Sequence, residues 1–232
     1  MLKDFIKLYL KSIPISKIRR DSDINFRTFS LKTGRLQVTL VNTQLRLEEI
    51  YPRKELYPFT ERHPEFLMIP IATCTQKIVG FILRGVSFKE YRIIFEPKKP
   101  SPLFGWEDFK DYQSEYPIVL CEGVKDAIYL KQHYKYVLSL NTSSISTANM
   151  EILKRMTNKV ILSYDNDETG LRMSKLDSKS LDENGISCRI VKPNHKDCAE
   201  YLENSYGELD YLSILDSSLK LLGGDGCGII KK

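Results

Sequence analysis

Acidic side chains follow three apolar segments in the second half of the chain. Glu122 comes directly after the run PIVLC, and Asp126 lies four residues further on. Asp165 and Asp167 follow the run KVILSY, and Asp197 follows a third apolar segment. If these segments are parallel strands, their carboxyl ends meet at one edge of a sheet, where open sheets of this kind build their sites. The spacing therefore predicts one acidic pocket assembled from distant parts of the chain.

The residue types in this pocket indicate a particular chemistry. Carboxylates that lie close together repel one another unless a cation neutralises them. Hard oxygen ligands without His or Cys favour Mg²⁺ or Mn²⁺ over zinc, and none of the five cysteines belongs to a C-x-x-C pair, so no zinc site is expected. Such an ion keeps open coordination positions for phosphates, and a pair of such ions can support phosphoryl or nucleotidyl transfer.

Each acidic motif also has a simpler interpretation. The letters DNDETG at 165–170 are typical of a solvated turn that caps a helix. The letters EGVKD at 122–126 fit a strand-to-helix turn with an acid near the positive end of the helix dipole. The motifs occur in order, each after an apolar run, and this arrangement favours function over coincidence.

The elements that must position these residues alternate between strand and helix. Apolar runs predict strands at 117–121, 136–140, 159–164 and 187–191. Helical spacing predicts helices at 124–133, 147–156, 171–183, 198–203 and 209–222. This alternation predicts an α/β fold with a largely parallel sheet.

The first half has a different pattern of predicted secondary structure. Two predicted strands, 24–31 and 35–41, flank a KTG turn, three more lie at 69–72, 78–83 and 91–95, and 1–13 could form one amphipathic helix. We expect a smaller α+β subdomain with an antiparallel sheet, joined to the second half by the three-proline segment 96–103. The expected domains are 1–110, 111–205 and a C-terminal helix with a flexible tail at 206–232.

The net charge also differs between the two halves of the chain. Residues 1–110 carry 20 Lys and Arg against 12 Asp and Glu, whereas residues 111–232 carry 15 against 18, giving a net charge of +5 for the chain. This contrast suggests an anionic partner held near a site that needs carboxylates. No apolar run is long enough to span a bilayer, and the N-terminus has no secretory cleavage site, so we expect a cytoplasmic protein without a membrane partner.

Three segments together resemble the Toprim domain shared by bacterial-type primases, topoisomerases and several nucleases. They are IVLCEGVKDAIYL at 118–130, VILSYDNDETG at 160–170 and HKDCAEYL at 195–202. The resemblance covers about residues 114–204 and implies a Toprim-type parallel sheet flanked by helices.

The same resemblance assigns roles to the acidic residues. It implies that Glu122, Asp165 and Asp167 are catalytic and hold the metal ion. Asp126 and Asp197 would be further metal ligands in the same pocket.

Two more segments favour a primase. The letters VLSLNTSS at 137–144 are similar to the S-L-G-T-S segment of bacterial and phage primases, with Asn141 in place of Gly. Asn tolerates the left-handed backbone that Gly would supply. Residues 69–91 are similar to the basic subdomain that precedes Toprim in primase polymerase cores.

The similarity of this upstream region implies contacts to template phosphates and incoming nucleotides. The candidates are Arg84, Lys89, Arg92 and, for stacking on a base, Tyr91; Lys125 beside the first acidic motif is a further phosphate candidate. A solvated strand surface would carry the same basic residues, and Tyr91 fits a core position equally well.

The resemblance implies a DNA primase core, a nucleotidyltransferase of RNA-polymerase type that joins NTPs into short primers on single-stranded DNA. A replicative helicase or another replisome protein would be its partner. The sequence contains neither a zinc-binding nor a helicase module, which predicts a minimal core of phage type. Two alternatives stay open: a Toprim nuclease acting on DNA or RNA, and a noncatalytic ssDNA-binding subunit. A topoisomerase would need an extra domain for its tyrosine nucleophile.

Overall fold

The computed structural model describes residues 20–21, 24–30, 37–42, 65–75, 78–85, 91–95, 101–131, 133–192 and 207–222. The chain divides into two compact units, one of residues 1–71 and 78–97 and the other of residues 72–77 and 98–232. The division near residue 97 falls inside the proline-rich segment 96–103. The helices predicted at 1–13 and 198–203 lie outside the described residues.

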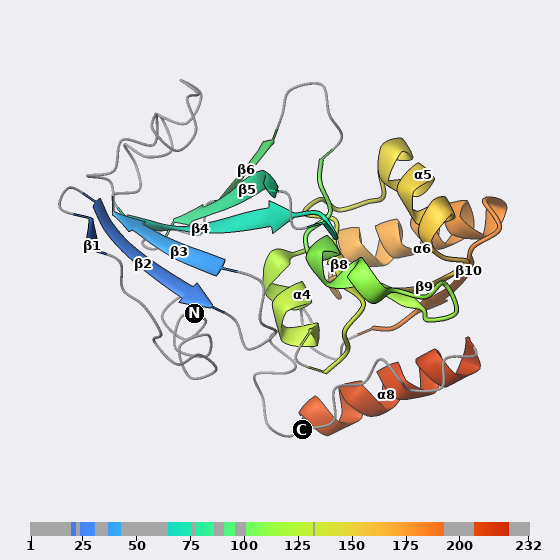
Figure 1. The fold of residues 1–232 in the computed structure, drawn as a ribbon. Helices are drawn as coiled ribbons and strands as arrows, with labels where there is room; N and C mark the ends of the chain where they lie inside the picture. The colour runs from blue at the N-terminus through green and yellow to red at the C-terminus, as the bar shows by residue number, and fades with distance from the viewer. Residues whose placement is uncertain are drawn as a thin grey trace. The chain divides into compact units, whose positions relative to one another are not determined.

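The first unit contains a six-stranded sheet whose strands follow chain order (Figure 1). Its strands are β1 (Arg20–Asp21), β2 (Ile24–Ser30), β3 (Gln37–Asn42), β4 (Glu65–Ala72), β5 (Ile78–Gly85) and β6 (Tyr91–Phe95). The pairs β1–β2, β2–β3, β3–β4 and β5–β6 are antiparallel, as the sequence predicts for this half. Ile69 and Ile71 of β4 and Ile82 and Leu83 of β5 are buried.

The second unit contains a four-stranded sheet in the order β10-β9-β7-β8, and all of its neighbouring strands are parallel. Its strands are β7 (Ile118–Cys121), β8 (Val137–Ser139), β9 (Lys159–Ser163) and β10 (Ser187–Ile190). Helices α4 (Val124–Leu130), α5 (Thr147–Met156) and α6 (Glu168–Glu183) connect them, and α8 (Gly207–Leu221) follows. The predicted α/β class with a parallel sheet is confirmed.

Burial explains why these short segments form strands. All four residues of β7 and all three of β8 are buried, and β9 is buried from Val160 onward. Continuous apolar runs are typical of parallel strands that are covered on both faces. Figure 1 shows α5 and α6 on one side of this sheet and α4 on the other, the arrangement that right-handed crossovers require.

The order of the strands creates a switch point between β7 and β9. From β7 the chain runs through α4 to β8 on one side, whereas from β9 it runs through α6 to β10 on the other. The loops that leave these two adjacent strands therefore diverge. Open α/β sheets bind their ligands at such a point, beyond the carboxyl ends of the strands.

Aromatic side chains close the opposite end of the sheet. The ring of Tyr136, just before β8, lies 4.9 Å from the ring of Tyr112, 5.5 Å from Phe109 and 5.6 Å from Tyr116, measured between centroids. This end is packed, which leaves the carboxyl ends of the strands as the place for chemistry. Among the described residues no helix is both long and apolar enough to cross a bilayer.

A segment before β7 is held to the edge strand β8. Phe104 and Ser139 exchange backbone hydrogen bonds of 3.0 and 2.9 Å. Lys131, at the end of α4, donates from Nζ to the Gly105 carbonyl over 3.0 Å. The same ammonium forms ion pairs with Glu107 at 3.0 Å and Asp108 at 2.7 Å, and all three side chains are nearly buried. This buried cluster fixes residues 104–108 against the sheet.

Candidate functional site

Glu122 stands at the end of β7, the central strand of the switch point. Its Oε1 accepts a hydrogen bond of 3.2 Å from the backbone amide of Asp165, which lies two residues past the end of β9. Burial, followed by the negative charge of Asp165, raises the pKa of Glu122 from 4.5 to about 7. Asp167 and Asp126 add smaller contributions in the same direction. The carboxylates therefore share one electrostatic environment.

Asp165 and Asp167 belong to the turn between β9 and α6 and have different surroundings. Asp165 is partly buried, whereas Asp167 is exposed and is the N-cap residue of α6. The Asp167 Oδ1 accepts a hydrogen bond of 2.9 Å from the Gly170 amide. Asp167 thus performs the helix-capping role that the simpler interpretation of DNDETG predicts, and its second oxygen is not used by that bond.

Gly170 lets this turn approach β7 closely. A Cβ atom at position 170 would overlap the carbonyl oxygen of Asp165 and would lie 2.9 Å from the Glu122 Oε1. A residue with a side chain would therefore push apart the two carboxylate-bearing strand ends. The glycine in DNDETG serves the spacing of the acidic site.

Asp126 lies in the first turn of α4 and is 6% exposed. Its Oδ2 lies 2.7 Å from the position that a Cβ would occupy at Gly123, so the carboxylate is turned back toward the start of the helix. Its charge contributes to the raised pKa of Glu122. Asp126 belongs to the acidic surroundings from a buried position.

The loop after β8 approaches Glu122 from the other side. Ser139 donates from its hydroxyl to the Glu122 carbonyl over 2.9 Å, and the Asn141 amide donates to the same hydroxyl oxygen over 3.1 Å. Asn141 has a φ of 57°, the left-handed conformation expected for the residue in place of Gly. The next two side chains, Thr142 and Ser143, are exposed.

The acidic side chains fit a divalent cation in their chemistry. Glu122, Asp165 and Asp167 all carry hard oxygen donors, and a positive charge would relieve the repulsion among these carboxylates. Within the described ranges, no three His, Cys, Asp or Glu side chains converge on one point as a complete metal site. Mg²⁺ commonly binds through only one or two carboxylates because it keeps several waters, so a set of fewer than three converging carboxylates is compatible with this chemistry.

The other predicted site residues lie in the first unit, on helix α4 or outside the described residues. In the first unit, β5 and β6 pair Arg84 with Tyr91 and Leu83 with Arg92. Only the backbone of Arg84, Tyr91 and Arg92 is described. Lys89 and Asp197 lie outside the described residues. In the second unit, the Lys125 Nζ lies over the ring of Tyr129 on its own helix, 5.6 Å from the centroid.

Sequence reasoning missed Tyr164 and Asp177. The Asp177 Oδ2 accepts a hydrogen bond of 2.7 Å from the Tyr164 hydroxyl and one of 2.9 Å from the Ile145 amide. Asp177 falls on the buried face of α6, together with Gly170, Ser174 and Leu181. An acid at helical spacing on an otherwise inward-facing stripe was the available signal.

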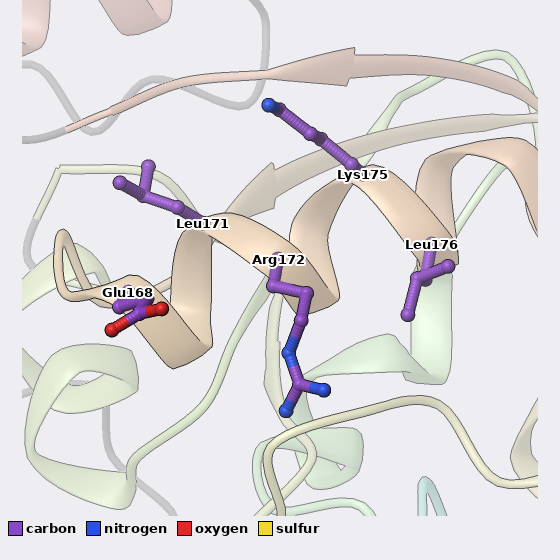
Figure 2. Close-up of a pocket in the computed structure, with 5 residues that line it drawn as sticks. All are labelled: Glu168, Leu171, Arg172, Lys175 and Leu176. Atoms are coloured by element: carbon purple, nitrogen blue, oxygen red, sulfur yellow. The ribbon is translucent and has the colours of Figure 1, made fainter.

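An open hollow of about 400 Å³ runs along α6, starting one residue after Asp167 (Figure 2). Its lining residues are Glu168, Leu171, Arg172, Lys175 and Leu176. Figure 2 shows the Arg172 and Lys175 side chains leaving the helix in different directions, so the two cations do not converge. Leu176 is 54% exposed.

Residues 119–202 match the Toprim-like family. The DNA primase of Clostridium acetobutylicum is 24% identical over 203 residues, which cover 84% of this chain and 33% of that primase. The DNA primase of Helicobacter pylori strain 26695 is 26% identical over 157 residues, covering 63% of this chain and 27% of that primase. The chain thus spans between a quarter and a third of the length of these relatives.

Solved structures give the same fold. The zinc-binding and RNA polymerase domains of the Aquifex aeolicus primase align with a TM-score of 0.57 and 23% identity, covering 66% of this chain and 40% of that one. A DnaG primase catalytic domain bound to ssDNA aligns with a TM-score of 0.57 and 20% identity, covering 74% and 62% of the two chains. The expected fold, that of a Toprim-containing primase core, is confirmed.

Proposed function

The chain contains a Toprim-like domain at residues 119–202, and on that premise we propose that it is the catalytic core of a DNA primase. It would act as a nucleotidyltransferase that joins NTPs into short RNA primers on single-stranded DNA. The observation that carries the proposal is the contact between Glu122 and Asp165 at the switch point of the parallel sheet. Two kinds of similarity, to curated primases and to primase folds, support it.

In this proposal Glu122, Asp165 and Asp167 hold Mg²⁺ or Mn²⁺. The bound ion would neutralise phosphate charge and orient the reacting oxygens. The Glu122 Oε1 is engaged by the Asp165 amide, which leaves Oε2 as the atom that could accept the proton of a ribose hydroxyl. Burial and the neighbouring acids raise the pKa of Glu122 to about 7 in the metal-free chain, and a bound cation would lower it, which would leave the carboxylate ionised near neutral pH. Asp126 and Asp197 remain proposed additional ligands of this pocket.

The nucleic acid and the nucleotide would be bound by basic residues. We assign this role to Arg84, Lys89, Arg92 and Lys125, and stacking on a base to Tyr91. The excess of positive charge over residues 1–110 supports the assignment, because phosphate contacts position a strand without reading its sequence. Residues 111–205 would then be the catalytic domain and 1–110 the basic subdomain of a cytoplasmic protein.

A product assay tests the proposal. The protein is incubated with single-stranded DNA, NTPs and Mg²⁺ or Mn²⁺, with and without a replicative helicase, and short oligoribonucleotides are expected. Asp165→Asn and Glu122→Gln should abolish them, whereas Asp182→Asn, an exposed acid near the far end of α6, should not. The absence of product on varied templates would overturn the proposal. Strand cleavage without NTPs would assign the site to a nuclease instead.

A further inference from the structure

The buried carboxylate of Asp177 connects two segments that are distant in sequence. Its Oδ2 accepts from the Tyr164 hydroxyl over 2.7 Å and from the Ile145 amide over 2.9 Å. Asp177 is 6% exposed and Tyr164 is 4% exposed. The bond from Tyr164 is thus shielded from water and stronger than it would be at the surface, whereas the bond from Ile145 is partly buried.

The two connected segments flank the acidic site. Tyr164 directly precedes Asp165 and follows the last residue of β9. Ile145 lies at the far end of the loop after β8, and the near end of that loop is held to the Glu122 carbonyl by Ser139. The loop is therefore tied at one end to Glu122 and at the other, through Asp177, to the residue beside Asp165.

The helix that carries Asp177 also carries the turn of the acidic site. Asp167 caps the first turn of α6 through the Gly170 amide, and Asp177 follows almost three turns later on the buried face. Burying a carboxylate is unfavourable unless hydrogen bonds compensate. Both bonds reach out of the helix to site-forming segments, so the carboxylate fixes those segments rather than the helix that carries it.

We propose that Asp177 is a positioning residue of the acidic site, an inference that rests on the proposed function. By holding Tyr164 and Ile145 on one oxygen atom, it sets the spacing between the β9 turn and the β8 loop. The loop that carries the exposed residues Thr142 and Ser143 is then held at both of its ends. Asp177 itself touches neither metal nor substrate.

Four variants of the full chain separate this role from simple packing. Asp177→Ala removes both hydrogen bonds, and Tyr164→Phe removes one of them while keeping the ring. Asp177→Asn keeps a carbonyl oxygen that can accept both and serves as the conservative rescue. Leu181→Ala is the packing control, because Leu181 is fully buried one turn further along the same face of α6.

Three readouts are compared at a temperature where every variant is folded: Mn²⁺ affinity, amide exchange at Ile145, and kcat and KM for nucleotide addition. Asp177→Ala should accelerate Ile145 exchange at least ~10-fold and weaken Mn²⁺ binding or kcat about 10- to 100-fold, the range typical of outer residues that orient a metal site. Tyr164→Phe should show a smaller effect on Mn²⁺ affinity or kcat. Asp177→Asn and Leu181→Ala should stay within about threefold of wild type.

The outcomes distinguish this inference from the proposed function. Faster Ile145 exchange in Asp177→Ala with unchanged Mn²⁺ affinity and unchanged kcat would overturn the positioning role, as would equal losses in Leu181→Ala. If the wild-type protein makes no primers, the proposed function fails, and the inference is decided by Mn²⁺ affinity and Ile145 exchange alone. If Asp177→Ala does not fold, the comparison of Tyr164→Phe with Asp177→Asn in the same readouts decides whether Asp177 positions the site.

Discussion

The Glu122 Oε1 accepts a hydrogen bond of 3.2 Å from the backbone amide of Asp165, across two neighbouring parallel strands. The residues are 43 positions apart in the chain. They meet because β7 and β9 are adjacent in the sheet although β8 lies between them in sequence. The acidic site is thus a direct consequence of the strand order, and the predictions below follow from its geometry.

The raised pKa of Glu122 predicts a pH-dependent stability for the metal-free protein. Below about pH 4.5 Glu122 is protonated in both the folded and the unfolded chain. Between pH 4.5 and about 7 only the folded chain holds the proton, so the free energy of unfolding should fall as pH rises through this window. Because Glu122 is partly exposed, solvent screening reduces the effect to about 1–2 kcal/mol.

Denaturant unfolding of wild type and Glu122→Gln at a series of pH values measures this pH dependence of the free energy of unfolding. The stability of the variant relative to wild type should increase by about 1–2 kcal/mol between pH 4.5 and 8, and Mg²⁺ at pH 8 should narrow the difference. A difference that stays constant over the whole range would contradict the electrostatic coupling of the acidic residues.

Gly170→Ala should damage both stability and the site. The added Cβ would overlap the Asp165 carbonyl oxygen, which belongs to the backbone and cannot simply rotate away. We expect a loss of about 2–3 kcal/mol in the free energy of unfolding, together with weaker Mn²⁺ binding.

Gly185→Ala provides the matched control on the same helix–strand unit. Gly185 has a φ of +77° and no atom within 4 Å of an added Cβ, so its substitution introduces only backbone strain of about 1–2 kcal/mol. Mn²⁺ binding should be unchanged. Equal effects of the two substitutions on Mn²⁺ affinity would show that Gly170 does not set the spacing of the carboxylates.

Lys131→Met should strongly destabilise the second unit. The substitution leaves the buried Glu107 and the nearly buried Asp108 without their shared cation, and removing one partner of a buried ion pair typically costs about 3–5 kcal/mol. Glu107 is already incompletely satisfied, since its Oε2 is buried without a hydrogen-bond partner.

Lys220→Met is the surface counterpart, because Lys220 pairs with Asp216 along α8 while its side chain is 65% exposed. Its substitution should change the free energy of unfolding by less than about 1 kcal/mol. Thermal or denaturant unfolding of both variants gives the comparison. Similar small losses for the two lysines would mean that the buried cluster contributes no more than a surface ion pair.

Local pattern was sufficient to predict the parallel-sheet unit. The runs around Val119 and Ile161 are apolar over several residues, and such runs, alternating with helical segments, are typical of buried parallel strands. The left-handed Asn141 was predictable from the resemblance to the S-L-G-T-S segment, in which Gly takes its place and Asn tolerates the same backbone. The placement of Glu122 and Asp165 at the carboxyl ends of their strands followed from the alternation of strands and helices.

Contacts between distant residues were not predictable in the same way. The link from Lys131 to Glu107 joins residues 24 positions apart, and the link from Asp177 to Ile145 joins residues 32 apart. Hydrophobic periodicity carries no information about which polar groups meet across elements. The different roles of Asp165 and Asp167 also depend on where the chain turns, since β9 ends at Ser163 and Asp167 already caps the next helix.

Calorimetric titration of Mn²⁺ into the metal-free chain tests most directly whether Glu122 and Asp165 share a cation. Wild type should take up the ion, and Asp165→Asn should bind it at least ~10-fold more weakly, whereas Asp182→Asn should match wild type. No heat of binding in wild type, or equal affinity in wild type and Asp165→Asn, would contradict the assignment of a metal site to these strand ends.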